Sequence, residues 1–401
     1  MLTNFCTDPQ PCPANPPLVN GVETDEDRYF FDHFFSNISY KLSCRNDGEN
    51  PFVVLLMPMA LEHQGLMHSI LALSGSHLMI REPAKYENRR FHHYSRAIQI
   101  LSETIAKCNT TGNNSLPDDP TVASTLIMCV NTVCEGDTNG MYRPHLDGIG
   151  ELVRQRLRTL SAAPGKASAF SRFLIEFFLY HDTLRSMTGL DRRPSFFGNL
   201  ELPNFMDPKR AGSLIGVIDG LFNIISKITK LRDQLRSRGL AGKGRGEDFE
   251  TTSEALSIDS DLRQWTPSQP PGHPHYHGAQ VYRQCVCIYL FRTIMPSQKH
   301  PTITQAVDVG LDLLQQTQAS TGIESILLMP IFILGCAAFD AEQRPVVSQY
   351  FDTVQEWSSL GNVGPTRAVV ERIWQLMDAE DPLSWDWETV MRNMGYDFLI
   401  A

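Results

Sequence analysis

The chain has 401 residues, of which 42% are hydrophobic and 20% are charged, and its formal net charge is −10 at pH 7. A chain of this length can bury enough surface to fold without disulfide or metal staples. The acidic balance disfavours a surface that binds the phosphate backbone of nucleic acids, because such surfaces need clustered Lys and Arg.

Residues 1–24 are rich in proline and poor in side chains to bury, so we expect a disordered tail. The tail has neither the basic start nor the apolar core of a secretory signal. Further along, no apolar stretch reaches the roughly 18–20 residues of a membrane span. Pro330 interrupts the longest candidate, 325–339. We therefore expect a soluble protein in a reducing intracellular compartment.

The segment 50–78 is the most informative part of the chain. Pro51 and Pro58 bracket a short apolar run, and proline is best tolerated just before a helix or in its first turn. From Leu66 onward the apolar residues follow helical spacing, which predicts one wide stripe that faces inward. Small side chains between 72 and 76 would let a neighbouring helix approach closely. The residues alone predict a buried helix and no chemistry.

Helical periodicity continues to the C-terminus, with loops rich in Gly, Pro and polar residues between the periodic segments. We expect helices over 27–42, 87–107, 121–134, 144–157, 167–187, 213–235, 276–293, 302–317, 324–339, 345–358 and 366–377. No run of period-two alternation flanked by hairpin turns is found. The predicted class is all-α, an array of antiparallel helix pairs. One domain would cover 25–401, with a flexible loop at about 239–275, where Gly and basic residues are followed by Pro and His.

The cysteines do not predict a metal site. There are nine of them, an odd number in a long chain, which argues against a disulfide framework. A binuclear zinc cluster needs six thiolates at tight local spacing. Here Cys6 and Cys12 stand alone before Cys44, and Cys285 and Cys287 would lie on nearly opposite faces of a helix. We predict buried free thiols.

His181 and Asp182 form a doublet that metal-dependent phosphohydrolases place within a helix. No further ligand sets complete such a site, so we favour a polar contact at the edge of a helix pair. The histidines of the loop 273–277 lack carboxylate or thiol partners and are expected at the surface. No nucleophile elbow, phosphate loop or nucleotide-binding glycine fingerprint occurs. We expect no catalytic residue and no enzyme; a helical metal hydrolase that uses His181 and Asp182 is the least favoured alternative.

The C-terminal end is aromatic, with Trp374, Trp385, Trp387, Tyr396 and Phe398. The favoured interpretation is a lid that closes the last helices. The alternative is a docking surface for a co-regulator, because exposed aromatic anchors carry interface energy.

Several segments match, in order, the pattern of one known family. An aromatic-rich helix is followed by "nPf...llPla...p.l.hailAlsa.hl", then by "yy..Al..L", "HL.Ga" and "ff.yhD". The matching segments are 29–35, 50–78, 92–101, 145–149 and 177–182, with 329–332, 371–374 and 385–387 near the end. In this order the chain resembles the fungal-specific transcription factor domain, the helical regulatory region behind binuclear zinc-cluster DNA-binding domains.

The resemblance implies a nuclear, all-helical regulatory body that restrains or licenses the transcription of fungal metabolic or secondary-metabolite genes. It implies a small effector in an inter-helix pocket, or partners such as other transcription regulators or a second copy of the chain, and no membrane. Candidate pocket or switch residues are His77, His181 and Asp182, which are polar residues on largely apolar elements. Satisfied core contacts are the simpler interpretation of all three.

The chain departs from the family pattern because no six-cysteine cluster is present, so we expect no DNA-binding residue and no zinc in this chain. Zinc would be a cofactor only if an upstream cluster exists, and DNA would be reached through a missing or a partner zinc cluster. Three explanations stay open: a gene that extends upstream, a trimmed chain, or a true cluster-less relative. In the last case the protein would act as a protein-interaction scaffold or co-regulator.

Overall fold

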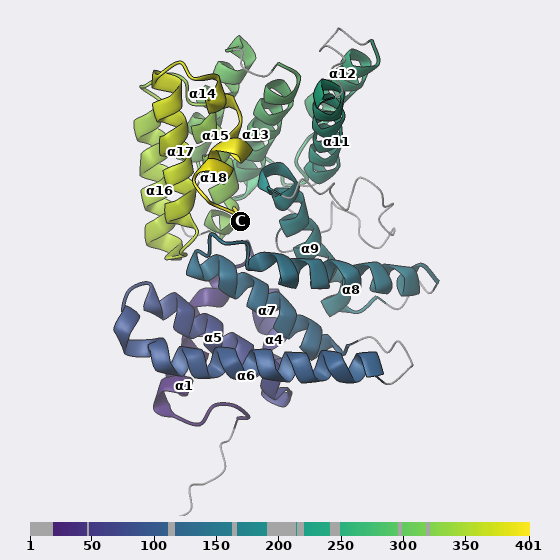
Figure 1. Ribbon diagram of the computed structural model, residues 1–401, viewed down its shortest axis with the longest axis vertical. Coiled ribbons are helices and arrows are strands. Elements are labelled where there is room, and N and C mark those ends of the chain that lie inside the picture. The colour runs from purple at the N-terminus through teal and green to yellow at the C-terminus, as the bar shows by residue number, and fades with distance from the viewer. Residues whose placement is uncertain are drawn as a thin grey trace, which may run out of the picture.

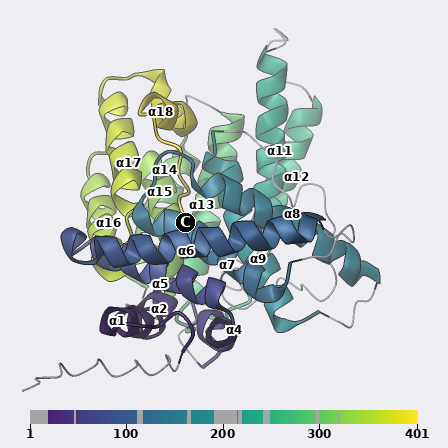
Figure 2. The same ribbon diagram turned by 60° about the horizontal axis from the view of Figure 1, so that its bottom comes forward.

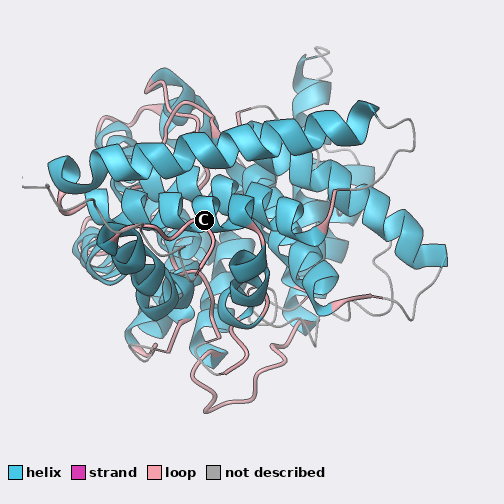
Figure 3. Cartoon of the chain, turned by 90° about the horizontal axis from the view of Figure 1, so that it is seen from below, coloured by secondary structure: helices cyan, strands magenta, loops and turns pink. Residues whose placement is uncertain are grey.

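The fold is built from helices in the part of the chain that the structure describes (Figure 3). The computed structural model describes residues 19–45, 48–110, 117–162, 167–190, 214, 220–240, 249–295, 299–317 and 321–401. Within these ranges the pairing of extended backbone is limited to an isolated bridge between Asn139 and Asp397. The predicted all-α class is confirmed. None of the described helices is long and apolar enough to cross a membrane.

The N-terminal half forms the lower body in Figure 1. Its elements are α1 (Asp25–His33), a π-helical turn (Phe34–Ile38), α2 (Ser39–Lys41), α3 (Pro51–Val54), α4 (Leu56–Glu62), α5 (Gln64–Met79), α6 (Pro83–Thr110), α7 (Asp119–Glu135) and α8 (Tyr142–Ala162).

The predicted buried helix is α5, which packs against α6 and α7 and is buried from Gly65 to Leu78. A Cβ at Gly75 would lie 2.7 Å from the Cβ of Arg90 on α6, so the small residues do let a neighbouring helix come close. Figure 2 shows α6 as a long helix across the outside of this half.

The C-terminal half forms the upper body. Its elements are α9 (Ala169–Thr188), α11 (Leu221–Leu240), α12 (Phe249–Gln264), α13 (Tyr276–Ile294), α14 (Pro301–Gln315), a 3₁₀ turn (Ile323–Ile326), α15 (Leu328–Cys336), α16 (Arg344–Ser358), α17 (Val363–Asp378), a second 3₁₀ turn (Pro382–Trp385) and α18 (Trp387–Asn393). Helices α8 and α9 lie where the two halves meet, and the α11–α12 hairpin stands to one side (Figure 1).

The prediction of a loop throughout 239–275 is wrong in its middle. Helix α12 occupies Phe249–Gln264 and is held against α11 and α13 by the buried Ala255, Ile258 and Leu262. Residues 241–248 lie outside the described part of the chain. The same holds for residues 1–18 of the predicted tail, whereas Val19 and Val22 are described and pack against the core.

The chain ends inside the molecule. Phe398, Leu399 and Ile400 are at most 2% exposed, and the C-terminus lies where the two halves meet (Figure 1). A single large cluster of buried apolar side chains extends through both halves. The polar contacts where the halves meet therefore lie beside a continuous apolar core that also joins the two halves.

Candidate functional site

The last turn of α16 receives basic side chains from the N-terminal half. Lys41 donates to the carbonyl oxygen of Trp357. His77 Nε2 donates to the Ser358 carbonyl at 2.8 Å, and Arg81 Nη2 donates to Ser359 Oγ at 2.7 Å. Cations are favourable at this place, because the last carbonyls of a helix lack intrahelical partners and carry the negative end of its dipole. We call Lys41, His77, Arg81 and their three acceptor residues the α16-end cluster.

A second histidine orients His77 from α1. His33 Nε2 lies 3.1 Å from His77 Nδ1. A carbonyl oxygen can only accept, so His77 carries its proton on Nε2 and its Nδ1 accepts from His33. Burial, together with the nearby His77, Lys41 and Arg81, lowers the pKa of His33 to about 4. Burial also lowers the pKa of His77, against the opposite effect of its bond to Ser358. Both rings are therefore neutral at pH 7.

Beside this cluster the backbones of the two halves are in direct contact. Gly361, just after α16, donates its N–H to the carbonyl of Cys134 at 2.8 Å. A Cβ at Gly361 would lie 2.6 Å from the carbonyl carbon of Glu135, and Gly136 has a φ of +71°. Only glycine allows this approach, because a side chain at Gly361 or at Gly136 would push the two chain segments apart.

The C-terminal segment is clipped to the turn between α7 and α8. Asp397 N donates to the carbonyl of Thr138 at 2.8 Å, and Gly140 N donates to the carbonyl of Asp397 at 2.7 Å. The carboxylate of Asp397 forms an ion pair with Arg143 at 2.7 Å. The α16-end cluster, the glycine contact and this clip together make up what we call the seam between the halves.

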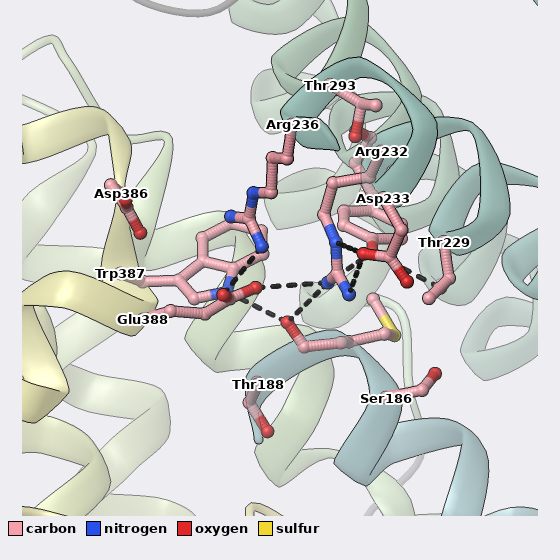
Figure 4. A network of polar contacts seen from close by, with 12 residues as sticks. Ser186, Thr188, Thr229, Arg232, Asp233, Arg236, Thr293, Asp386, Trp387 and Glu388 are labelled. Atoms are coloured by element: carbon pink, nitrogen blue, oxygen red, sulfur yellow. Dashed lines mark hydrogen bonds and ion pairs between the residues drawn. The ribbon is translucent and has the colours of Figure 1, made fainter. Parts of the chain in front are cut away.

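A second polar network joins α9, α11, α13 and α18 inside the C-terminal half (Figure 4). Arg232 Nη1 donates to Tyr289 at 2.9 Å and to Glu388 at 3.0 Å, while Arg236 donates to Glu388 at 2.7 Å. Trp387 Nε1 donates to the carbonyl of Met187 at 3.1 Å. Burial lowers the pKa of Arg232, but Tyr289, Glu388 and Asp233 outweigh it and hold the pKa above its ordinary value.

Arg292 fastens the aromatic C-terminal residues to α13 and α15. Its guanidinium lies 5.1 Å from the ring centre of Trp385 and 4.9 Å from that of Trp387. It donates to the carbonyls of Cys336 and Ser384. Trp387 and Phe398 are 6% and 2% exposed, and the partly buried Trp374, Trp385 and Tyr396 pack against the core, which agrees with the predicted lid over the last helices.

The three candidate residues predicted from the sequence make separate sets of contacts. His77 lies in the seam. His181 is buried on α9, where its Nδ1 lies 2.8 Å from the carbonyl of Phe177 and burial lowers its pKa to about 4. Asp182 accepts from Arg185 at 2.8 Å, and Arg185 also pairs with Asp147 on α8 at 2.7 Å. The structure thus does not unite them in one cluster, and their role in an effector pocket stays a prediction.

The sequence analysis missed a buried network around Asp27. This carboxylate accepts from both Arg89 Nε and Nη2 at 2.5 Å and from His93 Nε2 at 2.8 Å. His93 Nδ1 in turn lies 2.8 Å from His68 Nδ1, which connects α1, α6 and α5. Burial raises the pKa of Asp27, but the bonds from Arg89 and His93 outweigh it and hold the pKa far below its usual range. The sequence feature that could have revealed this network is the spacing of Arg89 and His93, which places both side chains on one face of a helix.

The described cysteines do not fit a thiolate zinc cluster. Those at 44, 108, 129, 134, 285, 287 and 336 are free. Burial raises the pKa of Cys44, Cys129 and Cys336 to about 12, so these stay protonated thiols. Among described residues no group of three or more His, Cys, Asp or Glu could hold a metal ion. Cys6 and Cys12 lie outside that part of the chain.

The comparison with protein families identifies the family of the chain. The profile of the fungal specific transcription factor domain matches residues 28–401. The chain belongs to this family. The ordered segments that carried the resemblance are thus part of a fungal-specific transcription factor domain that covers nearly the whole chain.

A characterised relative of the chain is consistent with this family assignment. The chain is 20% identical over 395 residues to the transcriptional activator protein UGA3 of Saccharomyces cerevisiae, covering 86% of this chain and 72% of the relative. No solved structure matches the chain.

Proposed function

We propose that this domain is the regulatory module of a fungal transcription regulator that acts in the nucleus on metabolic or secondary-metabolite genes. The observation that carries the proposal is the seam, where polar contacts and one glycine contact join the two halves beside their shared apolar core. An effector or a partner protein would bias the domain between a closed and an open seam. DNA would be reached through a zinc cluster upstream of this chain or on a partner regulator.

The free energies of the hydrogen bonds in the seam are compatible with such a switch. Each bond from a charged group in the seam is worth about 1.5–3 kcal/mol when buried, and less at the half-exposed Lys41 and the exposed Arg81. Shifting a population from 1:99 to 99:1 takes about 5.5 kcal/mol of differential binding. The contacts at the end of α16 are thus of the size that one ligand or partner can outweigh.

A reporter assay tests the proposal. The full chain is fused to a heterologous DNA-binding domain in yeast, and reporter output is compared between the wild type and the His77→Gln variant. Weakening the seam should change the output several-fold at equal protein abundance, measured by immunoblot. The matched control is Lys85→Gln, because Lys85 pairs only with neighbours on its own helix end. Equal output from all three fusions in every growth medium would contradict the proposal.

A cluster-less co-regulator is the second candidate, and α12 favours it. Phe249 is 87% exposed and Leu256 is 65% exposed, seven residues apart on the same face of this helix. The α11–α12 hairpin stands away from the body, which leaves that face accessible (Figure 2). In this case the fused chain alone would not activate the reporter, and the Phe249→Ser, Leu256→Ser variant would lose co-purification with zinc-cluster regulators.

A further inference from the structure

The α16-end cluster carries more positive charge than its surroundings balance. Among described residues, neither Lys41 nor Arg81 forms an ion pair with a carboxylate, although the chain has 45 acidic residues against 35 Lys and Arg. The charged groups that shift the pKa values of His33, Lys41 and His77 are all basic. In a protein with a net charge of −10, this is an unusual local excess.

The carboxylates beside the cluster in sequence do not neutralise it. Glu82 follows Arg81 but pairs with Lys85 at 2.8 Å. Asp32 and Glu356 are exposed, and neither contributes to the pKa of His33, Lys41 or His77. The charge excess therefore lies on the N-terminal half, where side chains from α2, α5 and the turn after α5 converge on the end of α16.

The end of α16 compensates only part of this charge. A helix C-terminus is equivalent to roughly half a negative charge, whereas Lys41 and Arg81 bring two full positive ones. Burial lowers the pKa of Lys41, and the proximity of Arg81 lowers it further. Both side chains also have unused hydrogen-bond donors. An ammonium has three N–H donors and a guanidinium has five, and each makes a single hydrogen bond here.

The position is accessible to a small ligand. Arg81 is exposed, Lys41 is half-buried, and Trp357 lies beside Lys41 with its ring centre 5.1 Å from the ammonium. An oxyanion with two or three oxygens could accept from the ammonium and the guanidinium at once, since guanidinium geometry suits carboxylate and phosphate.

We propose that the α16-end cluster is a binding site for a small anion, the carboxylate or phosphate group of an effector, held between Lys41 and Arg81. The proposal rests on the proposed function and gives the effector its chemical class. Lys41 and Arg81 both belong to the N-terminal half, and their acceptors at the end of α16 hold the two side chains in position only while the seam is closed, so the anion finds both cations in place in the closed arrangement. It binds the closed arrangement better than the open one, and this difference in affinity closes the seam.

Thermal unfolding of the full chain tests the site. The melting temperature is followed with inorganic phosphate and with citrate, against sodium chloride at equal ionic strength, and we expect a saturable rise with at least one of the two anions. Phosphate alone would assign a phosphate-bearing effector, and citrate alone a carboxylate. The variants Lys41→Gln and Arg81→Gln should lose the rise, while the controls Lys85→Gln and Arg372→Gln keep it, since Arg372 is exposed on α17 and bonds only Gln375.

A second readout does not depend on the variants folding. The Cε1–H resonances of His33 and His77 in the wild type should move saturably with the same anion at constant pH, and the apparent Kd should rise about tenfold or more in Arg81→Gln. Unmoved histidine resonances with both anions, or equal anion effects in Lys41→Gln and Lys85→Gln, would overturn the anion site. The reporter response to His77→Gln would be unaffected by that failure, so the two proposals are tested separately.

Discussion

Replacing Glu388 by glutamine removes the negative charge that Arg232 and Arg236 share while keeping the side-chain shape. Glu388 is 2% exposed and Arg232 is 7% exposed, so this pair is buried, whereas the side chain of Arg236 is 30% exposed and keeps solvent. Breaking a buried ion pair costs about 3–5 kcal/mol, because the remaining charge is left without compensation. Asp233 still pairs with Arg232 at 2.9 Å. We therefore expect the low end, about 3 kcal/mol of unfolding free energy.

The assay is calorimetry of the full chain. With about 2.1 cal/mol/K of unfolding entropy per residue, a chain of 401 residues that unfolds as one unit loses about 1.2 °C of Tm per kcal/mol, hence about 4 °C. The matched control is Glu371→Gln, whose pair with Arg367 at 2.8 Å is solvent-exposed and should cost below about 0.5 kcal/mol.

The double variant Arg232→Met, Glu388→Leu gives a further check, because apolar replacement of both partners is often neutral where removal of one is not. It should recover much of the loss caused by Glu388→Gln. Equal melting temperatures for Glu388→Gln and Glu371→Gln would show that the buried network does not hold α18 in place, and the reasoning would fail.

Three other perturbations follow from the same structure. Burial holds the pKa of His68 at about 4, below its unfolded value near 6.5, so the unfolded chain binds more protons between these pH values and stability falls as the pH falls through this window. His68→Gln should lower the slope of unfolding free energy against pH by about 1.4 kcal/mol per unit, measured by urea titration from pH 7 to 4.5; an unchanged slope would be evidence against the buried neutral ring. Gly361→Ala should force the seam apart and cost about 2 kcal/mol or more, read as a separate early transition in calorimetry, and an unaltered single transition would contradict the contact with Glu135. Arg292→Lys should lose the stacking on both tryptophans, shift their fluorescence to the red and cost about 2–4 kcal/mol, whereas an unshifted spectrum would argue against the stacking of Arg292 on Trp385 and Trp387.

The helices that the sequence predicted best are those with a strong apolar pattern and no conflicting signals at their ends. Helix α5 was predicted from one wide apolar stripe with small residues beside it, and the structure buries it more completely, at every position from Gly65 to Leu78. Helix α12 was missed because Gly, Lys and Arg precede it and Pro and His follow it. Its buried stripe is only Ala255, Ile258 and Leu262, too weak a signal to outweigh those flanks.

The candidate site was only partly predictable. His77 stood out as a polar residue on an apolar helix, and the structure places it in the seam. Its partner could not be inferred, because the bond from His77 to Ser358 spans 281 residues of chain and depends on how the two halves dock. Of the doublet expected at a helix pair, Asp182 is linked to α8 through Arg185, which also pairs with Asp147, whereas the printed bond of His181 stays within α9.

Hydrogen–deuterium exchange tests most directly whether the seam opens as one unit. The amides of Gly361, Gly140 and Asp397 bond across it, to Cys134, Asp397 and Thr138 respectively. We predict that Arg81→Gln speeds exchange at all three amides together, while Val390 in α18 keeps its wild-type protection. Faster exchange confined to the end of α16, or spread evenly over both halves, would contradict the account.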